Sequence, residues 1–165
     1  RTLCLTSKKP GGEVHAPGGI YLEYYFQRTS HGSTLSRIVH ARLASIADNR
    51  SLSWQLYSDA LASDFIDIQG GTTAEGIHAG VMAGTVLIAL STFAGISVQS
   101  DTLHISPKLP DAWEKMSFGI TFKGVKYAFR ISAGETSITS EADSSIYCNN
   151  KQITLTTGKT SICFH

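Results

Sequence analysis

The segment AGVMAGTVLIALSTFAGISVQSDTLHI, residues 79–105, decides the fold because its hydrophobic period changes within it. Residues 79–94 are apolar, interrupted only by small or hydroxyl side chains, which is typical of a buried helix. Beyond Gly95 the apolar residues alternate with polar ones, as at Leu103 and Ile105, which is typical of a strand. Gly95 suits the left-handed position that ends a helix. The chain is therefore predicted to divide at Gly95.

Three helices are predicted before this point. The first has one apolar face whose members recur at spacings of four and three, namely Leu35, Val39, Leu43 and Ile46. The second runs from Leu52 to Asp64. The third begins after Thr72, runs to Phe93 and is expected to be buried on most sides. Residues up to about Phe93 are therefore expected to be mostly helical, with a loop at residues 7–19.

Strands are predicted after Gly95. Apolar residues alternate in four sets, which are Phe118, Ile120 and Phe122; Tyr127, Phe129 and Ile131; Ile153 and Leu155; Ile162 and Phe164. Lys123-Gly124 and Asn149-Asn150 are turn signals between such sets. Residues 96–165 are therefore expected to form an antiparallel β-sandwich, which makes the chain α+β.

Composition excludes several classes of function. The 165 residues are enough to bury a core, but only 16% are charged and the net charge is +1. We therefore expect neither a nucleic-acid nor a membrane partner. The opening segment has no apolar run typical of a signal peptide. Three scattered cysteines, Cys4, Cys148 and Cys163, fit neither a metal site nor a disulfide framework, so a reduced, cytoplasmic chain is expected.

Two predicted helix starts carry residues suited to an anion. One is TSHGSTLS, residues 29–36, and the other is DIQGGTTAEGIH, residues 67–78. A helix start offers unpaired backbone N–H groups and the positive end of the helix dipole. Both stretches add glycines, hydroxyls and an imidazole. Together they suggest one polar pocket for a small anionic or hydroxyl-rich ligand.

These two stretches resemble the C-terminal portion of glycoside hydrolase family 65. That family contains inverting phosphorylases of α-linked glucose disaccharides such as maltose, trehalose and kojibiose, and related hydrolases. The segment LHISPKLP, residues 103–110, followed by Trp113 and Phe118, resembles the entry into the family's C-terminal β domain. The resemblance covers about Tyr24 to Ile131. It implies that residues 1–95 are the C-terminal part of an (α/α)6 barrel catalytic domain and that 96–165 are a β-sandwich domain.

The resemblance also implies a chemistry. An inverting hydrolase pairs a general acid with a carboxylate that activates water. A phosphorylase replaces that base and water with inorganic phosphate, here a co-substrate, and needs no cofactor or metal. The family's general-acid Glu lies upstream of the matched region, so we expect this chain alone to be an inactive fragment with no catalytic residue of its own. Its partners would be a disaccharide, phosphate, and the remainder of the same enzyme or another copy of the chain, covering exposed apolar helix faces.

By the same resemblance, four residues match the family's phosphate pocket: Gly32, Ser33, Thr34 and His78. Gly32 would let the backbone approach the anion. Ser33 and Thr34 could instead only cap a helix, and His78, in the second turn of the predicted third helix, could be a core histidine.

Two further residues are possible substrate contacts, His31 and Glu75. Glu75 also fits a capping box with Thr72, and it would be a general base only in a hydrolase. Arg28 and Arg37 are weaker candidates for neutralising an anion. The function predicted is an inverting disaccharide phosphorylase that cleaves an α-glucosidic bond. The alternatives are a trehalase-like hydrolase of the same family and a non-catalytic carbohydrate- or anion-binding remnant.

Overall fold

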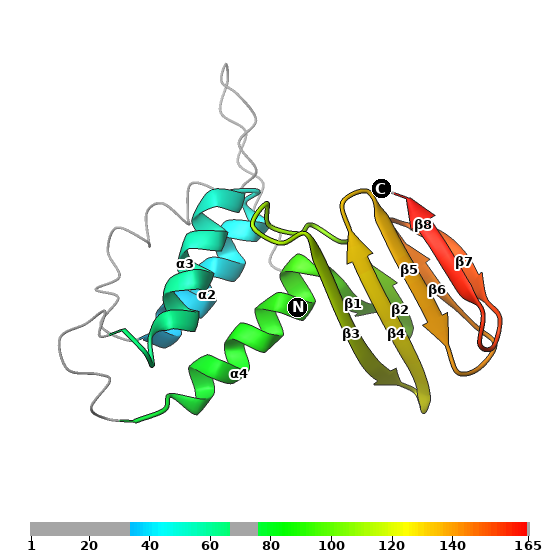
Figure 1. Ribbon diagram of the computed structural model, residues 1–165, viewed down its shortest axis with the longest axis horizontal. Helices are drawn as coiled ribbons and strands as arrows, with labels where there is room; N and C mark the ends of the chain where they lie inside the picture. The colour runs from blue at the N-terminus through cyan, green and yellow to red at the C-terminus, as the bar shows by residue number, and fades with distance from the viewer. Residues whose placement is uncertain (1–33, 67–75, 165) are drawn as a thin grey trace, which may run out of the picture. The chain divides into compact units, whose positions relative to one another are not determined.

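The computed structural model describes residues 34–66 and 76–164 (Figure 1). The chain separates into two compact units between Ile88 and Ala89. We call residues 34–66 and 76–88 the helical unit, and residues 89–164 the sandwich unit. Helices followed by two sheets confirm the α+β fold class. The assignment of 1–95 to a catalytic barrel and 96–165 to a sandwich domain stays a prediction.

The helical unit contains three helices, α2 (Thr34–Ile46), α3 (Arg50–Ala62) and α4 (Ala79–Ile88). A tight turn with Asp48 at φ 59° joins α2 to α3. Asn49 caps α3, because its side-chain oxygen accepts a hydrogen bond from the Leu52 N–H at 3.1 Å. The buried Ser53 hydroxyl donates to the Ala41 carbonyl at 2.8 Å, which ties α3 to α2.

Small side chains let these helices pack closely. The buried residues include several alanines, and the apolar members are Ile38, Ala41, Ala44, Leu56, Tyr57, Ala60, Val81 and Ile88. A Cβ atom placed on Gly84 of α4 would lie 2.9 Å from Cγ2 of Ile38, so this glycine sets the approach of α4 to α2. Burial also raises the pKa of the Tyr57 hydroxyl.

The predicted first helix is confirmed, but its predicted apolar face is not the buried one. Leu35, Val39, Leu43 and Ile46 are between 42% and 65% exposed. The face that packs inward carries Ile38, Ala41 and Ala44, because small side chains allow the close contact with α3 that larger ones would block. Periodicity finds the apolar positions of a helix but not the neighbour that it packs against.

The third helix also differs from its prediction. Residues 76–78 are not helical, and α4 begins at Ala79. Val86 and Leu87 are 60% and 59% exposed, so α4 is not buried on most sides. The run to Phe93 is completed by a π-helical turn, η2 (Ala89–Phe93), at the start of the sandwich unit.

Two four-stranded sheets make up the sandwich unit (Figure 1). The first has the order β1 (Ile96–Gln99), β2 (Thr102–Ile105), β6 (Ser144–Cys148), β7 (Lys151–Leu155). The second has the order β3 (Lys115–Phe122), β4 (Val125–Ser132), β5 (Glu135–Ser140), β8 (Thr160–Phe164). All pairs are antiparallel except β2 with β6. A parallel pair needs a long connection, and here β3, β4 and β5 lie between β2 and β6 in the chain.

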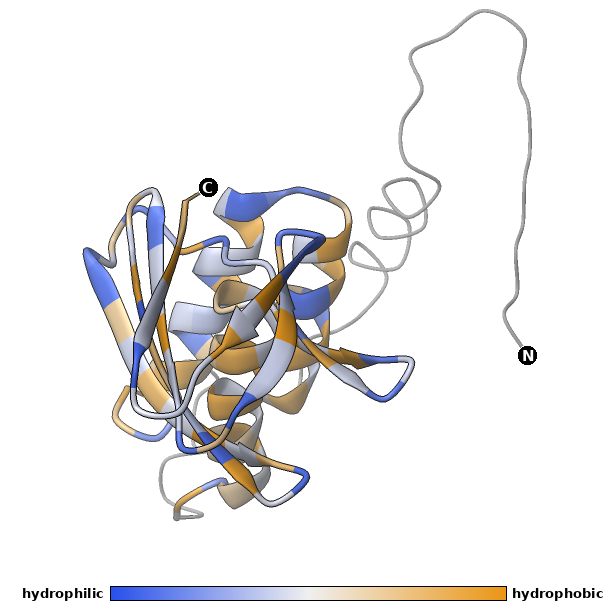
Figure 2. Cartoon of the chain, turned by 90° about the vertical axis from the view of Figure 1, so that its right-hand side faces the viewer, coloured by the Kyte–Doolittle hydropathy of each residue, from blue (hydrophilic) through white to orange (hydrophobic). Residues whose placement is uncertain are grey.

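Both sheets contribute to one hydrophobic core. Its fully or nearly fully buried members are Leu103, Ile105, Ile146, Cys148 and Leu155 from the first sheet and Tyr127, Phe129, Ile131, Ile138 and Cys163 from the second. Figure 2 shows hydrophobic and hydrophilic residues banding the strands, as alternate inward and outward side chains require. Burial, with a hydrogen bond and charge interaction from Cys163, raises the pKa of the Cys148 thiol to about 12. Both cysteines are free.

The two turns predicted from sequence are confirmed. Lys123 and Gly124 have φ of 51° and 79°, and Asn149 and Asn150 have φ of 49° and 63°, the positive pairs that a type I′ hairpin turn requires. The same geometry at Ser100-Asp101, with φ of 45° and 65°, was not predicted. An ion pair between Lys123 and Asp101 links two of these turns.

Gly95 lies where η2 leads into β1. Its φ of 67° confirms the left-handed position predicted for it. A Cβ atom here would lie 1.9 Å from the Ser106 carbonyl oxygen, closer than any side chain can come. The Gly95 carbonyl accepts from the Ser106 N–H at 3.1 Å, and the Phe93 carbonyl accepts from the Lys108 N–H at 2.8 Å. The backbone segments at Gly95 and Ser106 therefore lie in direct contact.

Candidate functional site

His78 lies directly before α4. Its carbonyl accepts hydrogen bonds from the N–H groups of Val81 at 2.9 Å and Met82 at 3.1 Å, which is the bonding of a residue that opens a helix. The prediction that placed it in the second turn is therefore wrong, because the helix begins later than its apolar pattern. At this position the imidazole lies at the positive end of the α4 dipole.

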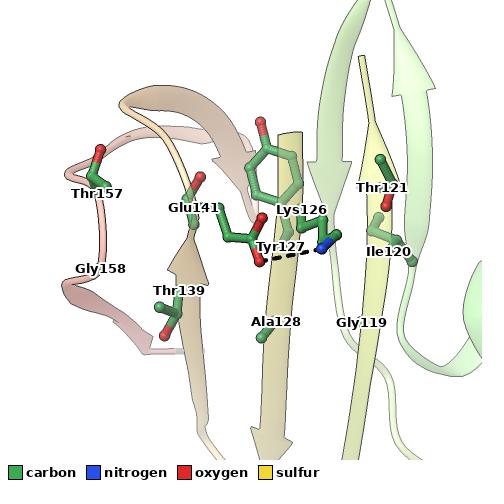
Figure 3. Close-up of a pocket in the computed structure, with 11 residues that line it drawn as sticks. Gly119, Ile120, Thr121, Lys126, Tyr127, Ala128, Thr139, Glu141, Thr157 and Gly158 are labelled. Atoms are coloured by element: carbon green, nitrogen blue, oxygen red, sulfur yellow. Dashed lines mark ion pairs between the residues drawn. The ribbon is translucent and has the colours of Figure 1, made fainter. Parts of the chain in front are cut away.

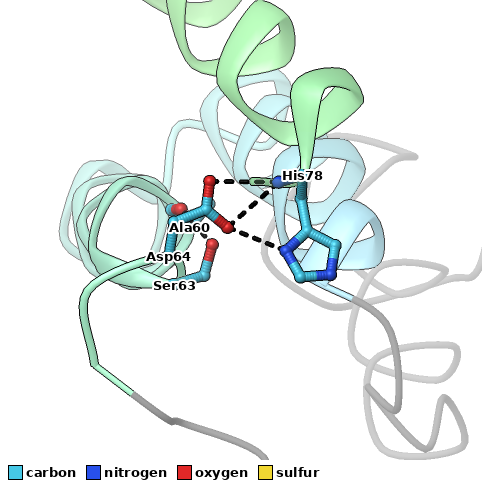
Figure 4. Close-up of polar contacts among 4 residues, drawn as sticks. All are labelled: Ala60, Ser63, Asp64 and His78. Atoms are coloured by element: carbon cyan, nitrogen blue, oxygen red, sulfur yellow. Dashed lines mark hydrogen bonds and ion pairs between the residues drawn. The ribbon is translucent and has the colours of Figure 1, made fainter. Parts of the chain in front are cut away.

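Asp64, just after the end of α3, holds His78 (Figure 4). Its Oδ1 lies 2.7 Å from Nδ1 of the imidazole. Its Oδ1 and Oδ2 lie 3.2 Å and 3.1 Å from the backbone nitrogen of His78. The Asp64 side chain is only 7% exposed and that of His78 is 25% exposed. One carboxylate therefore fixes both the backbone and the ring of His78.

These contacts determine which ring nitrogen carries a proton towards Asp64. An ionised carboxylate only accepts hydrogen bonds, so Nδ1 donates to it. The other nitrogen, Nε2, lies on the side of the ring away from Asp64 (Figure 4). The Asp64 carboxylate itself satisfies part of the positive end of α4. An anion attracted to this helix start would therefore meet the Nε2 side of His78.

The end of α3 is held in place beneath Asp64. The hydroxyl of Ser63, which is 1% exposed, donates to the Ala60 carbonyl at 2.7 Å (Figure 4). This bond satisfies one of the last carbonyls of the helix. It fixes the backbone next to Asp64 without touching His78.

Thr34 is the first residue of α2 and is 4% exposed. In Figure 1 the starts of α2 and α4 and the end of α3 lie at the same end of the helical unit. The Ile38–Gly84 contact sits about 6 Å along α2 from Thr34 and about 9 Å along α4 from His78, at 1.5 Å per residue. Thr34 and His78 therefore lie at similar levels on two adjacent helices.

The remaining candidate residues divide into two groups. Gly32, Ser33, His31, Glu75 and Arg28 lie outside the described residues. Arg37 pairs with Asp59 of α3 at 3.1 Å, and its side chain is 13% exposed, so it is a paired arginine between two helices. His40 is also structural, because its Nδ1 lies 2.7 Å from the Ser36 carbonyl oxygen one turn earlier.

Over residues 34–66 and 76–164, no group of three or more histidine, cysteine or acidic side chains is placed to hold a metal ion. No helix there is both long enough and apolar enough to cross a bilayer.

The sandwich unit has a hollow of about 720 Å³ on its second sheet (Figure 3). Gly119, Ala128 and Thr139 form its floor, since their side chains are small. Lys126 and Glu141 beside it are 3.6 Å apart, and both are 67% exposed. None of the candidate residues lines this hollow. It offers a shallow surface with one solvated ion pair, and no catalytic grouping.

Asp64 is not among the residues predicted for the site. The sequence predicts it only as the last residue of the second helix. Its partner is 14 residues later, and only the packing of α3 against α4 brings the two together. The detectable signal was limited to an acidic residue upstream of a histidine of interest.

Comparison with known proteins covers both units. Residues 19–87 match the glycosyl hydrolase family 65 central catalytic domain, and residues 96–155 match the C-terminal domain of that family. The trehalose 6-phosphate phosphorylase of Lactococcus lactis subsp. lactis (strain IL1403) is 40% identical over 121 residues, which cover 73% of this chain and 16% of that protein. The kojibiose phosphorylase of Escherichia coli (strain K12) is 30% identical over 134 residues, covering 81% and 18%.

A solved structure agrees. It is described as a kojibiose phosphorylase from the human microbiome, and it superimposes with a TM-score of 0.76 at 25% identity. The match covers 87% of this chain and 21% of that one. The chain thus spans less than a quarter of the length of each of these relatives.

Proposed function

This chain belongs to glycosyl hydrolase family 65, and we propose that it forms the C-terminal part of an inverting disaccharide phosphorylase. The enzyme cleaves an α-glucosidic bond with inorganic phosphate as co-substrate and without a cofactor. Inversion at an α-linked carbon gives the β-anomer of glucose 1-phosphate. The general acid that protonates the glycosidic oxygen comes from residues outside this chain, so the chain alone is inactive.

One observation carries the proposal. The imidazole of His78 is fixed at the start of α4, within the residues that match the family's catalytic domain. A phosphorylase must bind an anionic nucleophile, whereas an inverting hydrolase must create one with a base. A helix start with an imidazole donor favours the first task.

The phosphate pocket consists of Gly32, Ser33, Thr34 and His78. Thr34 opens α2 and His78 opens α4, and the Ile38–Gly84 contact supports their lying at one level of two helices. Adjacent packed helices have axes roughly 8–10 Å apart, which a phosphate and two side chains can span. His31 and Glu75, flanking these residues in the sequence, contact the sugar.

The substrate is an α-linked glucose disaccharide or its phosphate ester. The names of the relatives support this class, since they act on trehalose 6-phosphate or kojibiose. The other partner is the remainder of the same enzyme or another copy of the chain. The exposed apolar side chains of α2 and α4 support that expectation.

The enzyme works in the cytoplasm, away from nucleic acid and membranes. Cys148 and Cys163 are free and buried side by side in the sandwich core, which fits a compartment that keeps thiols reduced. The near-neutral net charge gives no attraction for polyanions.

The test uses the complete gene product that carries these residues. With phosphate and a panel of α-linked glucose disaccharides, we expect phosphate-dependent release of glucose 1-phosphate. Replacing His78 with Ala removes a charge-assisted hydrogen bond, worth roughly 1.5–3 kcal/mol, so the apparent phosphate affinity should fall about ten-fold or more.

Other outcomes identify the alternatives. Phosphate-independent release of free glucose, which survives His78→Ala and is abolished by Glu75→Gln, would show a hydrolase with Glu75 as its base. Sugar or phosphate binding without turnover of any disaccharide would show a binding module.

A further inference from the structure

We propose that Asp64 is a positioning residue for phosphate, because it holds the proton of His78 on Nδ1 and so turns Nε2 towards the anion. This inference rests on the proposed phosphorylase function. Asp64 does not itself touch phosphate. It acts through His78, from the end of the neighbouring helix.

The first support is the number and kind of contacts. Oδ1 of Asp64 accepts from the Nδ1 of His78 at 2.7 Å, within the range of charge-assisted bonds. The same carboxylate accepts from the His78 N–H. Two separate donors of one residue are thereby bound to one carboxylate, which leaves the ring little freedom to rotate.

The second support is burial. A carboxylate that is 7% exposed is expensive to keep unless its oxygens are hydrogen-bonded. Helix capping alone would need only the backbone contact, which a neutral Asn or Ser side chain can make. The contact to Nδ1 goes beyond capping and selects the state of the ring.

Whether Nε2 of His78 can donate to phosphate depends on which ring nitrogens carry a proton. With Nδ1–H committed to Asp64, a neutral His78 presents only a lone pair at Nε2, which cannot donate to a phosphate oxygen. A doubly protonated His78 donates to Asp64 from Nδ1 and to phosphate from Nε2. The imidazolium then lies between two anions and donates to both of them.

Asp64→Asn separates positioning from capping. The amide oxygen can still accept the His78 N–H, but an uncharged amide cannot make the charge-assisted bond that holds a doubly protonated ring between Asp64 and phosphate. In the complete enzyme we expect the KM for phosphate to rise about ten-fold, while the KM for the disaccharide changes less than about two-fold. Ser63→Ala is the matched control, since it removes a buried hydrogen bond beside Asp64 without touching His78. It should lower the melting temperature and leave the KM for phosphate unchanged.

A double-mutant cycle shows whether Asp64 acts through His78. His78→Gln keeps an N–H donor near the Nε2 position and has no Nδ1. In that background Asp64→Asn should change the KM for phosphate less than about two-fold. An equal ten-fold rise in both backgrounds, or a rise after Ser63→Ala as large as that after Asp64→Asn, would overturn the inference.

A measurement on the unmutated enzyme covers the case in which Asp64→Asn does not fold. Long-range ¹⁵N–¹H correlation of labelled histidines, assigned with His78→Gln, should place the proton of the neutral ring on Nδ1. A proton on Nε2 would contradict the inference whatever the enzyme's reaction. Failure of the proposed function looks different, since the unmutated enzyme would then form no glucose 1-phosphate.

Discussion

The two units of this chain bury their apolar side chains to different extents. In the sandwich unit the large aliphatic and aromatic residues of both sheets meet in a shared core, where Ile105, Ile131, Ile138 and Ile146 are completely buried. In the helical unit fewer large side chains are buried, and alanines share these positions, while Leu35, Val39, Leu43 and Ile46 are exposed. The described residues thus complete the core of the sandwich unit, whereas in the helical unit they leave an apolar face of α2 exposed.

This difference indicates where each unit gets its stability. Burial of large apolar side chains contributes roughly 1.5–3 kcal/mol each, so the sandwich unit has its own driving force. The helical unit buries fewer large apolar side chains, and it also depends on close backbone approach and on hydrogen bonds such as that from Ser53 to Ala41. It has apolar area left over for a partner, which fits the short span of this chain on its relatives.

The largest effect should come from breaking the sandwich unit at Gly95. In Gly95→Ala the new Cβ would lie 1.9 Å from the Ser106 carbonyl oxygen, so two backbone segments must separate. We expect a loss of about 4 kcal/mol or more in unfolding free energy, measured by urea denaturation. Gly158→Ala is the control, because its φ of 68° is similar but nothing lies within 4 Å of its Cβ. It should cost only about 1–2 kcal/mol. Equal losses would show that the Gly95 and Ser106 backbones are not in close contact.

An intermediate effect is expected at the contact between α2 and α4. Gly84→Ala places a methyl group 2.9 Å from Ile38, and the overpacking should outweigh the gain in helix propensity by about 1–2 kcal/mol. Gly80→Ala on the same helix meets no atom within 4 Å and should stabilise by up to about 1 kcal/mol. Hydrogen-exchange mass spectrometry of the α2 and α4 peptides measures both. Stabilisation by both changes would mean that the two helices are less closely packed.

The smallest effect on stability is expected on the uncovered face. Leu43→Gln in the 165-residue chain should change the unfolding free energy by less than about 0.5 kcal/mol, because Leu43 is 42% exposed. It should reduce self-association in analytical ultracentrifugation, since it removes apolar surface. Ile38→Val on the buried face is the control and should cost about 1 kcal/mol. A larger loss of unfolding free energy from Leu43→Gln than from Ile38→Val would show that the face of α2 that carries Leu43 is the buried one.

A feature of the fold could be predicted from the sequence where a few adjacent residues determine it, and not where packing determines it. The type I′ turns at Lys123-Gly124 and Asn149-Asn150 and the left-handed Gly95 depend on a few adjacent residues, and they are confirmed. The buried face of α2 depends on what packs against it, so periodicity alone selected Leu35 over Ile38. β5 and β6 were also missed, because serines and threonines surround Ile138 and Ile146.

The candidate site shows the same limit. His78 was found because it lies in a recognisable stretch, although its place at the helix start was not. Asp64 was missed because its role exists only through a contact 14 residues away. No pattern within one helix marks a residue that acts on the start of the next one.

The hydrogen bonds between Asp64 and His78 join the two ends of the segment that connects α3 to α4. Closing a flexible loop costs entropy that grows only with the logarithm of its length, about 0.6 kcal/mol for each doubling. These hydrogen bonds, rather than the number of residues between Asp64 and His78, therefore govern whether α4 starts beside the end of α3. We therefore expect that a change in the length of this connection keeps the imidazole in place, provided that Asp64 and His78 both remain.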